Sequence, residues 1–261
     1  MVHLRPLPGS HAWRPGSLPA LVAAARADAE VLLEGGCDAL LVENMHDAPY
    51  LRGSVPPETV AAMAVATAEV VRLGAPTGVQ VLAAANREAL GIAIATGASF
   101  IRVEAFAYAH VADEGWLDAS AGPLLRARAA LGADVRVWAD IRKKHAAHAV
   151  TADLTLADIA HGTAFMGADA LIVTGMTTGH AADPADLDRA RAGLPVVVGS
   201  GVTASNAAAF VQADALIVGS SLKRDGDWRN PVDLARVRAL VAAVDQSTRE
   251  SIRGIATPTR V

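Results

Sequence analysis

Strand-like and helix-like segments alternate eight times along this chain, and this alternation limits the possible folds more than any other feature. The strand-like segments are short apolar runs rich in β-branched residues, as expected of parallel strands buried on both faces. Strict alternation predicts a parallel sheet, and eight repeats favour an α/β fold of the (β/α)8 TIM-barrel type over a doubly wound sheet. We expect strands near 2–5, 39–43, 78–82, 100–104, 135–140, 170–174, 196–199 and 215–219, and helices near 18–34, 57–73, 86–96, 120–131, 155–166, 184–192, 204–211 and 231–244.

The connections between these segments differ in length on the two sides of the predicted barrel. Helix-to-strand connections are uniformly short, whereas most strand-to-helix connections are long. In a barrel the strand-to-helix loops gather at the C-terminal rim, where barrel active sites lie. The sequence therefore predicts one functional end, built by the long loops at 6–17, 44–56, 105–119, 141–154 and 175–183.

The chain has 261 residues, of which 52% are hydrophobic and 19% are charged, and this size and composition suit a single barrel with a large core. We expect a barrel domain over 1–246 and a polar tail over 247–261. The net charge of -4 with no basic face argues against nucleic acid. No apolar run reaches the roughly 18 residues of a membrane span. One cysteine, Cys37, and no signal peptide ahead of the first strand indicate a cytoplasmic protein. The alanine-rich helices favour a homo-oligomer.

Two glycine-rich strand ends close the repeating pattern. The seventh strand ends in Gly199, Ser200 and Gly201, and the eighth in Gly219, Ser220 and Ser221. At such ends backbone N–H groups hold an anionic group, and tight turns that simply need glycine are the alternative interpretation. We therefore expect a phosphorylated small molecule as the ligand, with the cations at 223–224 close to its phosphate.

Charged side chains at the ends of buried strands are costly unless they are paired or functional. Glu43 and Asp140 end the second and fifth strands and are candidate general bases. Lys144 follows the fifth strand, where a lysine in a dry mouth forms a Schiff base or stabilises an oxyanion or a phosphate. A solvated basic turn over 142–144 is the alternative. His145 completes the catalytic candidates.

A second set of polar residues lies at or near the same rim. Arg102 and Glu104 have the same parity in the fourth strand, so they face the same side and could pair with each other. A layer pair inside the barrel and a contact to the ligand are both compatible with that placement. The residues expected to bind substrate are His3, Asn44, Gln80, Arg102, Glu104 and Thr174.

The motifs at these strand ends resemble those of the BtpA/SgcQ family over nearly the whole chain. They are Val2 to Ser10, Val42-Glu43-Asn44 followed by Asp47-Ala48-Pro49, Phe100 to Val103, Lys144-His145-Ala146, Gly199 to Thr203 and Gly219 to Gly226. The resemblance implies a TIM barrel of the phosphate-binding type, and members have been linked to photosystem I biogenesis and to sugar-operon contexts. The resemblance further implies that the polar rim of the family corresponds, in this chain, to His3, Glu43, Asn44, Arg102, Asp140, Lys144, His145 and the two glycine-rich ends.

This chain departs from the family pattern at three places. Family members often carry Asn at the positions of Gln80 and Glu104, and an Arg-Asn-Asp turn where this chain has Ala84-Ala85-Asn86. These departures imply a different substrate.

We expect an enzyme that acts on a phosphorylated sugar or nucleotide, by cleavage or formation of a bond, glycosyl transfer or isomerisation at a phosphopentose. One alternative is a non-catalytic barrel that binds a phosphometabolite or serves as an assembly factor. Another is a metal-dependent hydrolase, which needs three converging ligands that no spacing in the sequence fixes. With no dinucleotide fingerprint and no Walker sequence, we predict no cofactor. Because spacing fixes no set of three ligands, we predict no metal site.

Overall fold

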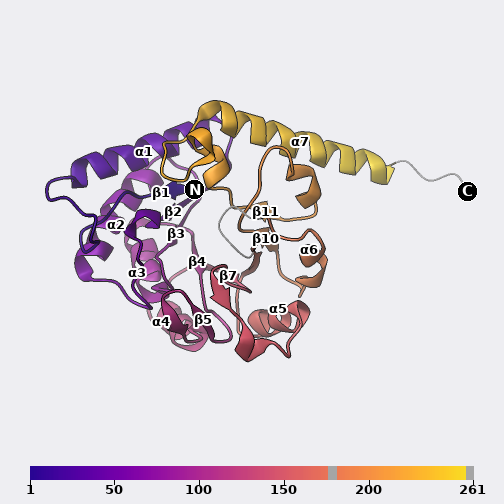
Figure 1. Cartoon of the computed structure of the whole chain (residues 1–261), viewed down its shortest axis with the longest axis horizontal. Coiled ribbons are helices and arrows are strands. Elements are labelled where there is room, and N and C mark those ends of the chain that lie inside the picture. The colour runs from indigo at the N-terminus through magenta and orange to yellow at the C-terminus, as the bar shows by residue number, and fades with distance from the viewer. Residues whose placement is uncertain (176–180, 257–261) are drawn as a thin grey trace, which may run out of the picture.

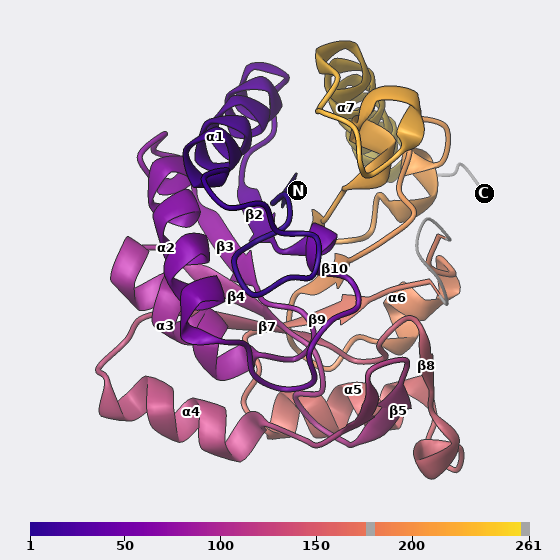
Figure 2. The same cartoon turned by 60° about the vertical axis from the view of Figure 1, so that its left-hand side comes forward.

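The computed structural model describes residues 1–175 and 181–256. Its main sheet is parallel and eight-stranded in the order β1-β2-β3-β4-β7-β9-β10-β11, and it curls with the helices on its outside (Figures 1 and 2). The backbone nitrogen of Met1 donates to the Val218 carbonyl at 2.8 Å, which joins the first strand to the last. The predicted (β/α)8 barrel is confirmed. Its strands are β1 (Val2–His3), β2 (Leu40–Glu43), β3 (Thr77–Gln80), β4 (Phe100–Val103), β7 (Arg136–Asp140), β9 (Ala170–Val173), β10 (Val196–Val198) and β11 (Ala215–Leu216).

The helices follow the predicted alternation, with two differences in type and length. The segment predicted as the seventh helix is a short 3-10 turn, and the last helix continues to Ala256. The predicted start of a polar tail at 247 therefore falls inside that helix, and the domain boundary stays a prediction. The helices are α1 (Leu18–Glu34), α2 (Pro57–Val71), α3 (Asn86–Thr96), α4 (Ala121–Ala130), α5 (Leu156–Phe165), α6 (Ala185–Arg189) and α7 (Leu234–Ala256), with 3-10 turns η1 (Met45–Asp47), η2 (Ala149–Thr151), η3 (Ala207–Phe210), η4 (Ser220–Leu222) and η5 (Arg224–Gly226).

Local sequence explains where individual helices begin and end. The Thr155 hydroxyl accepts from the Asp158 N–H at 3.1 Å, and the Asp158 carboxylate accepts from the Thr155 N–H, so a capping box starts α5. At the end of α3, Gly97 takes the left-handed conformation with φ 78°, which only glycine adopts without steric cost. Among the described helices, none combines the length and the apolar character needed to cross a membrane.

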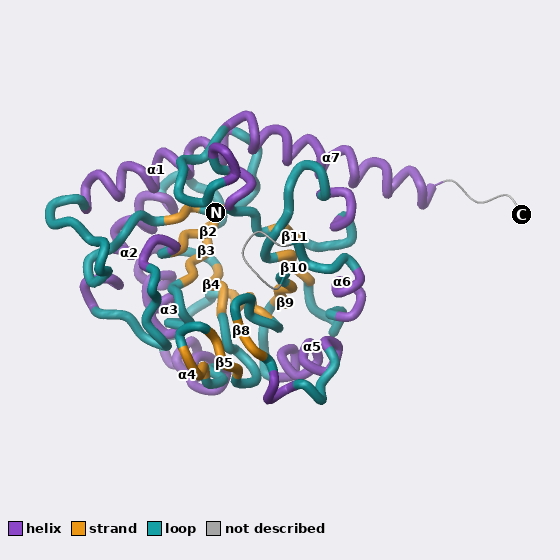
Figure 3. Tube along the Cα trace, viewed as in Figure 1, coloured by secondary structure: helices purple, strands orange, loops and turns teal. Residues whose placement is uncertain are grey.

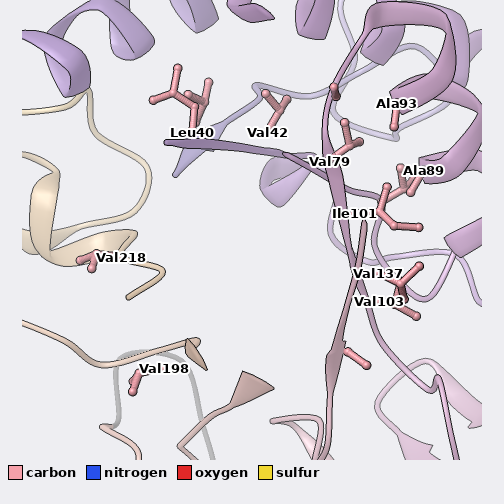
Figure 4. Close-up of a cluster of buried hydrophobic side chains, with 14 of the residues drawn as sticks. Leu40, Val42, Val79, Ala89, Ala93, Ile101, Val103, Val137, Val198 and Val218 are labelled. Carbon is pink, nitrogen blue, oxygen red and sulfur yellow. The ribbon is translucent and has the colours of Figure 1, made fainter. Parts of the chain in front are cut away.

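Alternation along the strands separates two apolar cores. Outward-facing residues such as Leu40, Val42 and Val79 pack against the helices (Figure 4). Inward-facing residues form a second cluster inside the barrel, which we call the apolar layer. The apolar layer consists of Leu41, Phe100, Trp138, Ala170, Ile172, Val197, Ala215 and Ile217, with Met1 packed against it.

Two aromatic rings dominate the apolar layer, and they fit inside the barrel because a neighbouring strand carries a glycine. Phe100 and Trp138 stack with their centroids 4.1 Å apart. A Cβ added at Gly78 would lie 2.1 Å from the Phe100 ring, so the neighbouring strand needs glycine at this position to admit the ring. The two rings fill part of the interior below the rim, and the apolar layer also lines a cavity of about 630 Å³ together with residues of α1 and α7.

Two of the long rim loops contain a small second sheet that the sequence did not predict. Strands β5 (His110–Ala112) and β6 (Gly115–Leu117) form an antiparallel hairpin in the loop after β4. Strand β8 (Ala146–Ala147), from the loop after β7, pairs with β5 (Figures 2 and 3). The small sheet therefore ties two loops together that are far apart in the sequence.

Candidate functional site

Five barrel strands carry an inward-facing polar residue at their last or next-to-last position, directly above the apolar layer. The parallel register places His3 opposite Glu43 and Glu43 opposite Gln80. In each of these strands but β3, where Gly78 holds the lower position, the polar residue follows an inward-facing apolar residue by two positions, because side chains alternate between the two faces of a strand. We call this ring the polar layer, and it consists of His3, Glu43, Gln80, Arg102 and Asp140, all of them buried.

A cavity of about 280 Å³ opens above part of the polar layer. We call it the mouth cavity. It brings together both predicted glycine-rich ends and two of the predicted catalytic residues, Glu43 and Lys144. Its walls are formed by Met1, His3, Glu43, Met45, Lys144, Gly199, Ser200, Gly201, Val202, Thr203, Ile217, Gly219, Ser220, Ser221, Gly226 and Arg236.

The side chains of Glu43 and Lys144 line the mouth cavity together. Neither has a hydrogen bond or an ion pair to another described residue. Burial raises the pKa of the Glu43 carboxyl, against the attraction of Lys144 and Arg102. Burial also lowers the pKa of the Lys144 ammonium, and Arg102 lowers it further, while Glu43 opposes the shift. The cavity thus favours an uncharged carboxyl and an uncharged amine more than water does.

Arg102 is paired with Asp140. Its Nε and Nη2 each donate to a different Asp140 carboxylate oxygen at 3.0 Å, and Nη1 donates to the Gly199 carbonyl at 3.4 Å. The two side chains are only 3% and 2% exposed. The ion pair between Arg102 and Glu104 that the sequence allowed is therefore not formed. The carboxylate of Asp140 in the neighbouring strand binds the guanidinium through two hydrogen bonds instead.

Glu104 and Gln80 lie beside the Arg102–Asp140 ion pair, and neither side chain bonds to a member of that pair. Burial raises the pKa of the Glu104 carboxyl to about 7, with Asp140 adding to the rise and Lys143 opposing it. Its Oε2 accepts from the backbone N–H of Ala84 at 3.0 Å. The buried Oε1 of Gln80 has no hydrogen-bond partner among the residues described. Glu104 is therefore a group that can hold a proton at neutral pH.

The two glycine-rich ends present backbone donors to the mouth cavity. The N–H groups of Gly201, Val202 and Gly219 donate to no acceptor in the described parts of the chain. Gly201 has φ 72°, a left-handed conformation that turns the chain at this point. The Ser200 and Ser221 hydroxyls are engaged: Ser200 Oγ accepts from the Gly175 N–H at 2.8 Å and Ser221 Oγ donates to the Val202 carbonyl at 2.6 Å. Unpaired N–H groups on two neighbouring turns form a suitable cradle for an anion.

The cation at this cradle differs from the one expected. Lys223 is buried, and its Nζ donates to Asp28 of α1 at 2.6 Å, so the expectation that it lies close to a phosphate is wrong. Arg236 of α7 lines the mouth cavity instead, and its Nη1 donates to the Ser221 carbonyl at 3.4 Å. Sequence analysis missed Arg236 because it lies in the final helix, outside any rim loop.

Several predicted residues lie away from the mouth cavity. The Asn44 amide is bonded to the Leu82 backbone, accepting at 2.7 Å and donating at 3.3 Å, and the Thr174 hydroxyl donates to the Arg142 carbonyl at 2.9 Å. His145 is exposed and is not among the described residues that line the cavity. Asn44 and Thr174 thus hold neighbouring backbone, and the substrate contacts expected of them stay predictions.

His3 forms one wall of the mouth cavity. Burial lowers the pKa of its imidazole well below the usual range, and Nδ1 lies 3.3 Å from the Trp228 carbonyl. The ring is therefore neutral at physiological pH. Within residues 1–175 and 181–256, no group of three or more His, Cys, Asp or Glu side chains is placed to hold a metal ion.

Comparison with known sequences identifies relatives along almost the full chain. The model of the BtpA family matches residues 1–246. The Caenorhabditis elegans protein F13E9.13, mitochondrial, is 42% identical over 260 residues, covering 95% of this chain and 93% of that protein. The photosystem I biogenesis protein BtpA of a Synechocystis strain is 37% identical over 257 residues, covering 95% and 88%.

Solved structures with the same fold are more distant in sequence. N-(5'-phosphoribosyl)anthranilate isomerase from Pyrococcus furiosus superposes with a TM-score of 0.54 at 16% identity, covering 84% of this chain and 94% of that chain. Orotidine 5'-monophosphate decarboxylase from Methanocaldococcus jannaschii superposes with a TM-score of 0.55 at 14% identity, covering 86% and 94%. At these identities the likeness establishes the barrel fold.

Proposed function

This chain belongs to the BtpA family, and we propose that it is an enzyme that acts on a phosphorylated sugar or nucleotide. The reaction proposed is the making or breaking of a bond, glycosyl transfer or isomerisation at a phosphopentose. One observation carries the proposal: unpaired N–H groups at two glycine-rich strand ends share a cavity with an unpaired carboxyl and an unpaired amine.

The phosphate is assigned to the glycine-rich ends. The N–H groups of Gly201, Val202 and Gly219 supply donors at a position where side chains leave room for a ligand. Arg236 adds a positive charge at the same wall. Backbone donors and a guanidinium suit phosphate oxygens, which accept several hydrogen bonds at once.

The reacting part of the substrate is assigned to the wall that carries Glu43 and Lys144. A buried carboxyl whose pKa is raised holds its proton more tightly than a carboxyl in water, so it can give that proton to a bound substrate. Asp140, a sequence-based candidate for a base, is assigned a different role because its carboxylate already holds Arg102. In this proposal Asp140 orients Arg102, and Glu43 moves the proton.

The structural neighbours support this substrate class by analogy alone. The names of the isomerase and the decarboxylase that share the fold both refer to phosphorylated substrates. Barrels of one fold carry unrelated activities, so the residues of the mouth cavity have to carry the proposal for this chain.

A thermal-shift series tests the proposal. Ribose 5-phosphate, a set of nucleoside monophosphates and inorganic phosphate are each compared with unphosphorylated ribose. A ligand at about 100 times its dissociation constant stabilises the folded state by roughly 2.7 kcal/mol, which a melting curve detects. We expect a selective shift with one phosphorylated class, which then defines the turnover assay. The absence of a shift with every phosphorylated compound would refute the phosphate assignment.

A further inference from the structure

The chain contains far fewer lysines than arginines. It contains three lysines, Lys143, Lys144 and Lys223, against 20 arginines. Lys143 Nζ donates to Glu114 at 2.7 Å, and Lys223 Nζ donates to Asp28 at 2.6 Å. Lys144 alone has no carboxylate partner among the described residues. The one unpaired lysine amine of the described chain therefore lies at the proposed substrate site.

Lysine and arginine differ in a way that makes this placement informative. A guanidinium stays protonated in proteins and has no lone pair to offer, whereas a lysine amine loses its proton when burial and neighbouring positive charge disfavour the ammonium. Burial and the neighbouring Arg102 both disfavour the Lys144 ammonium, while nearby carboxylates, Glu43 first among them, favour it. If the mouth cavity needed only a positive charge, arginine would serve equally well.

We propose that Lys144 Nζ forms an imine with the carbonyl carbon of a phosphorylated aldehyde or ketone held in the mouth cavity. This inference rests on the proposed function and narrows it to substrates with a carbonyl group, such as the open-chain form of a pentose phosphate. Lys144 and Glu43 line the same cavity as the glycine-rich ends, so a phosphate bound there places the rest of the molecule against both side chains.

The step is balanced by the two side chains. The lone pair of the neutral Nζ attacks the carbonyl carbon, and the electrons of the C=O π bond move to oxygen. One N–H proton then passes to that oxygen by way of the Glu43 carboxyl, which gives one proton and takes one back, and a neutral carbinolamine results. Glu43 next protonates the hydroxyl, which leaves as water while the nitrogen lone pair forms the C=N bond, and the Glu43 carboxylate accepts the remaining N–H proton. Carbonyl oxygen and two amine hydrogens leave as one water molecule, so no oxidant or reductant is required.

Reductive trapping tests the inference with ribose 5-phosphate as the probe. The full-length protein is incubated with the sugar phosphate and sodium cyanoborohydride, which reduces an imine to a stable secondary amine. We expect one adduct whose mass is that of the sugar phosphate less one oxygen atom. Cleavage after arginine releases residues 143–189, and fragmentation of this peptide assigns the adduct to Lys144 or Lys143. Trapping should saturate with probe concentration, and inorganic phosphate should block it.

Two matched variants separate imine formation from the effect of charge. Lys144→Arg keeps the positive charge but cannot form an imine, so we expect its adduct to fall to background while ribose 5-phosphate still shifts its melting temperature. Lys143→Arg changes the neighbouring residue and should keep the adduct. An adduct on Lys143 or Lys223, or equal trapping of unphosphorylated ribose, would overturn the inference.

The combined readouts also distinguish the two proposals. A melting shift with ribose 5-phosphate but no adduct on wild-type protein would refute the imine and leave the phosphate-binding enzyme standing. The absence of an adduct together with the absence of a melting shift with every phosphorylated compound would refute both. An adduct on Lys144 that phosphate blocks supports both.

Discussion

Arg102 and Asp140 form a bidentate ion pair across two adjacent barrel strands, with both donor–acceptor distances at 3.0 Å. The pair lies at the base of the proposed site, and the same guanidinium reaches the Gly199 carbonyl of the proposed phosphate cradle. It therefore links the fourth and fifth barrel strands to the seventh. Its burial makes each charge dependent on the other.

Asp140→Asn should destabilise the fold strongly. The substitution leaves the Arg102 guanidinium buried without its countercharge, which typically costs about 3–5 kcal/mol of the free energy of unfolding. Urea denaturation measures the loss. Arg238→Ala breaks an exposed pair with Glu34 and should cost less than about 1 kcal/mol. A loss from Asp140→Asn no larger than that of the control would contradict the structural role assigned to the pair.

Gly199→Ala should be destabilising because there is no room for a methyl group. A Cβ at this position would lie 2.5 Å from Ile172 Cγ2 and 3.1 Å from Arg102 Nη2. We expect a loss of roughly 1–3 kcal/mol in the free energy of unfolding. Gly91→Ala, inside α3 with its nearest contact at 4.0 Å, should instead stabilise the protein by up to about 1 kcal/mol. Similar urea midpoints for the two variants would contradict the packing described for Gly199.

Glu43→Gln should lower turnover without preventing ligand binding. An amide of the same shape cannot move a proton, and loss of a general acid–base group typically lowers kcat by about 10²–10⁴-fold. Steady-state kinetics on the substrate class found by thermal shift measures the effect, and the melting shift itself should be retained. Glu58→Gln, on the exposed first turn of α2, should keep full activity. A fully active Glu43→Gln protein would remove Glu43 from the mechanism.

Glu104 should make stability depend on pH. Burial raises the pKa of its carboxyl from 4.5 to about 7, so the folded protein binds this proton more tightly than the unfolded chain does. The stabilisation is fully present below about pH 4.5 and is lost as pH rises through 7. At 1.36 kcal/mol per pKa unit the change amounts to roughly 3 kcal/mol.

Urea melts between pH 4.5 and 7.5 check this slope. Glu104→Gln keeps an acceptor for the Ala84 N–H and should flatten the slope, because its side chain does not titrate. The exposed Glu34→Gln should keep the wild-type slope. Parallel pH profiles for wild type and Glu104→Gln would show that the Glu104 pKa is not raised.

Arg236→Ala should weaken the binding of phosphorylated ligands with little effect on folding. The guanidinium is exposed and lines the mouth cavity, so its loss should raise Kd by roughly three- to tenfold, and by less at high salt. Isothermal titration at two ionic strengths measures both effects. Arg238→Ala, two residues further along α7 and paired with Glu34, should leave Kd unchanged. Equal affinities for the two variants would remove Arg236 from the cradle.

The fold was predictable because the strands carry a simple pattern. Runs such as Val196 to Val198 are apolar on both faces and are bounded by turn residues, and eight of them alternate with helices. The small second sheet was not predictable in the same way. Its strands are two or three residues long, and the pairing of Val111 with Ala147 joins two loops whose proximity no local pattern encodes.

The candidate site was predictable where it depends on strand ends and unpredictable where it depends on distant partners. Glu43 and the glycine-rich ends follow directly from the position of each strand terminus. Lys223 has the same local signal, yet its ammonium is paired with Asp28, 195 residues earlier in the chain. Only the folded arrangement reveals this partner, and the same holds for Arg236, which reaches the cradle from α7.

The ion pair between Lys143 and Glu114 also determines where its neighbour Lys144 can lie. Glu114 belongs to the β5–β6 hairpin, 29 residues earlier in the chain, and β8 ties the segment after Lys144 to the same hairpin. Substitutions in this hairpin would therefore shift the amine through the backbone, without altering any group that contacts a ligand. Laboratory evolution toward a new substrate should accumulate mutations over 110–117 as well as in the cavity wall, and grafting this hairpin between relatives offers a compact way to transfer specificity.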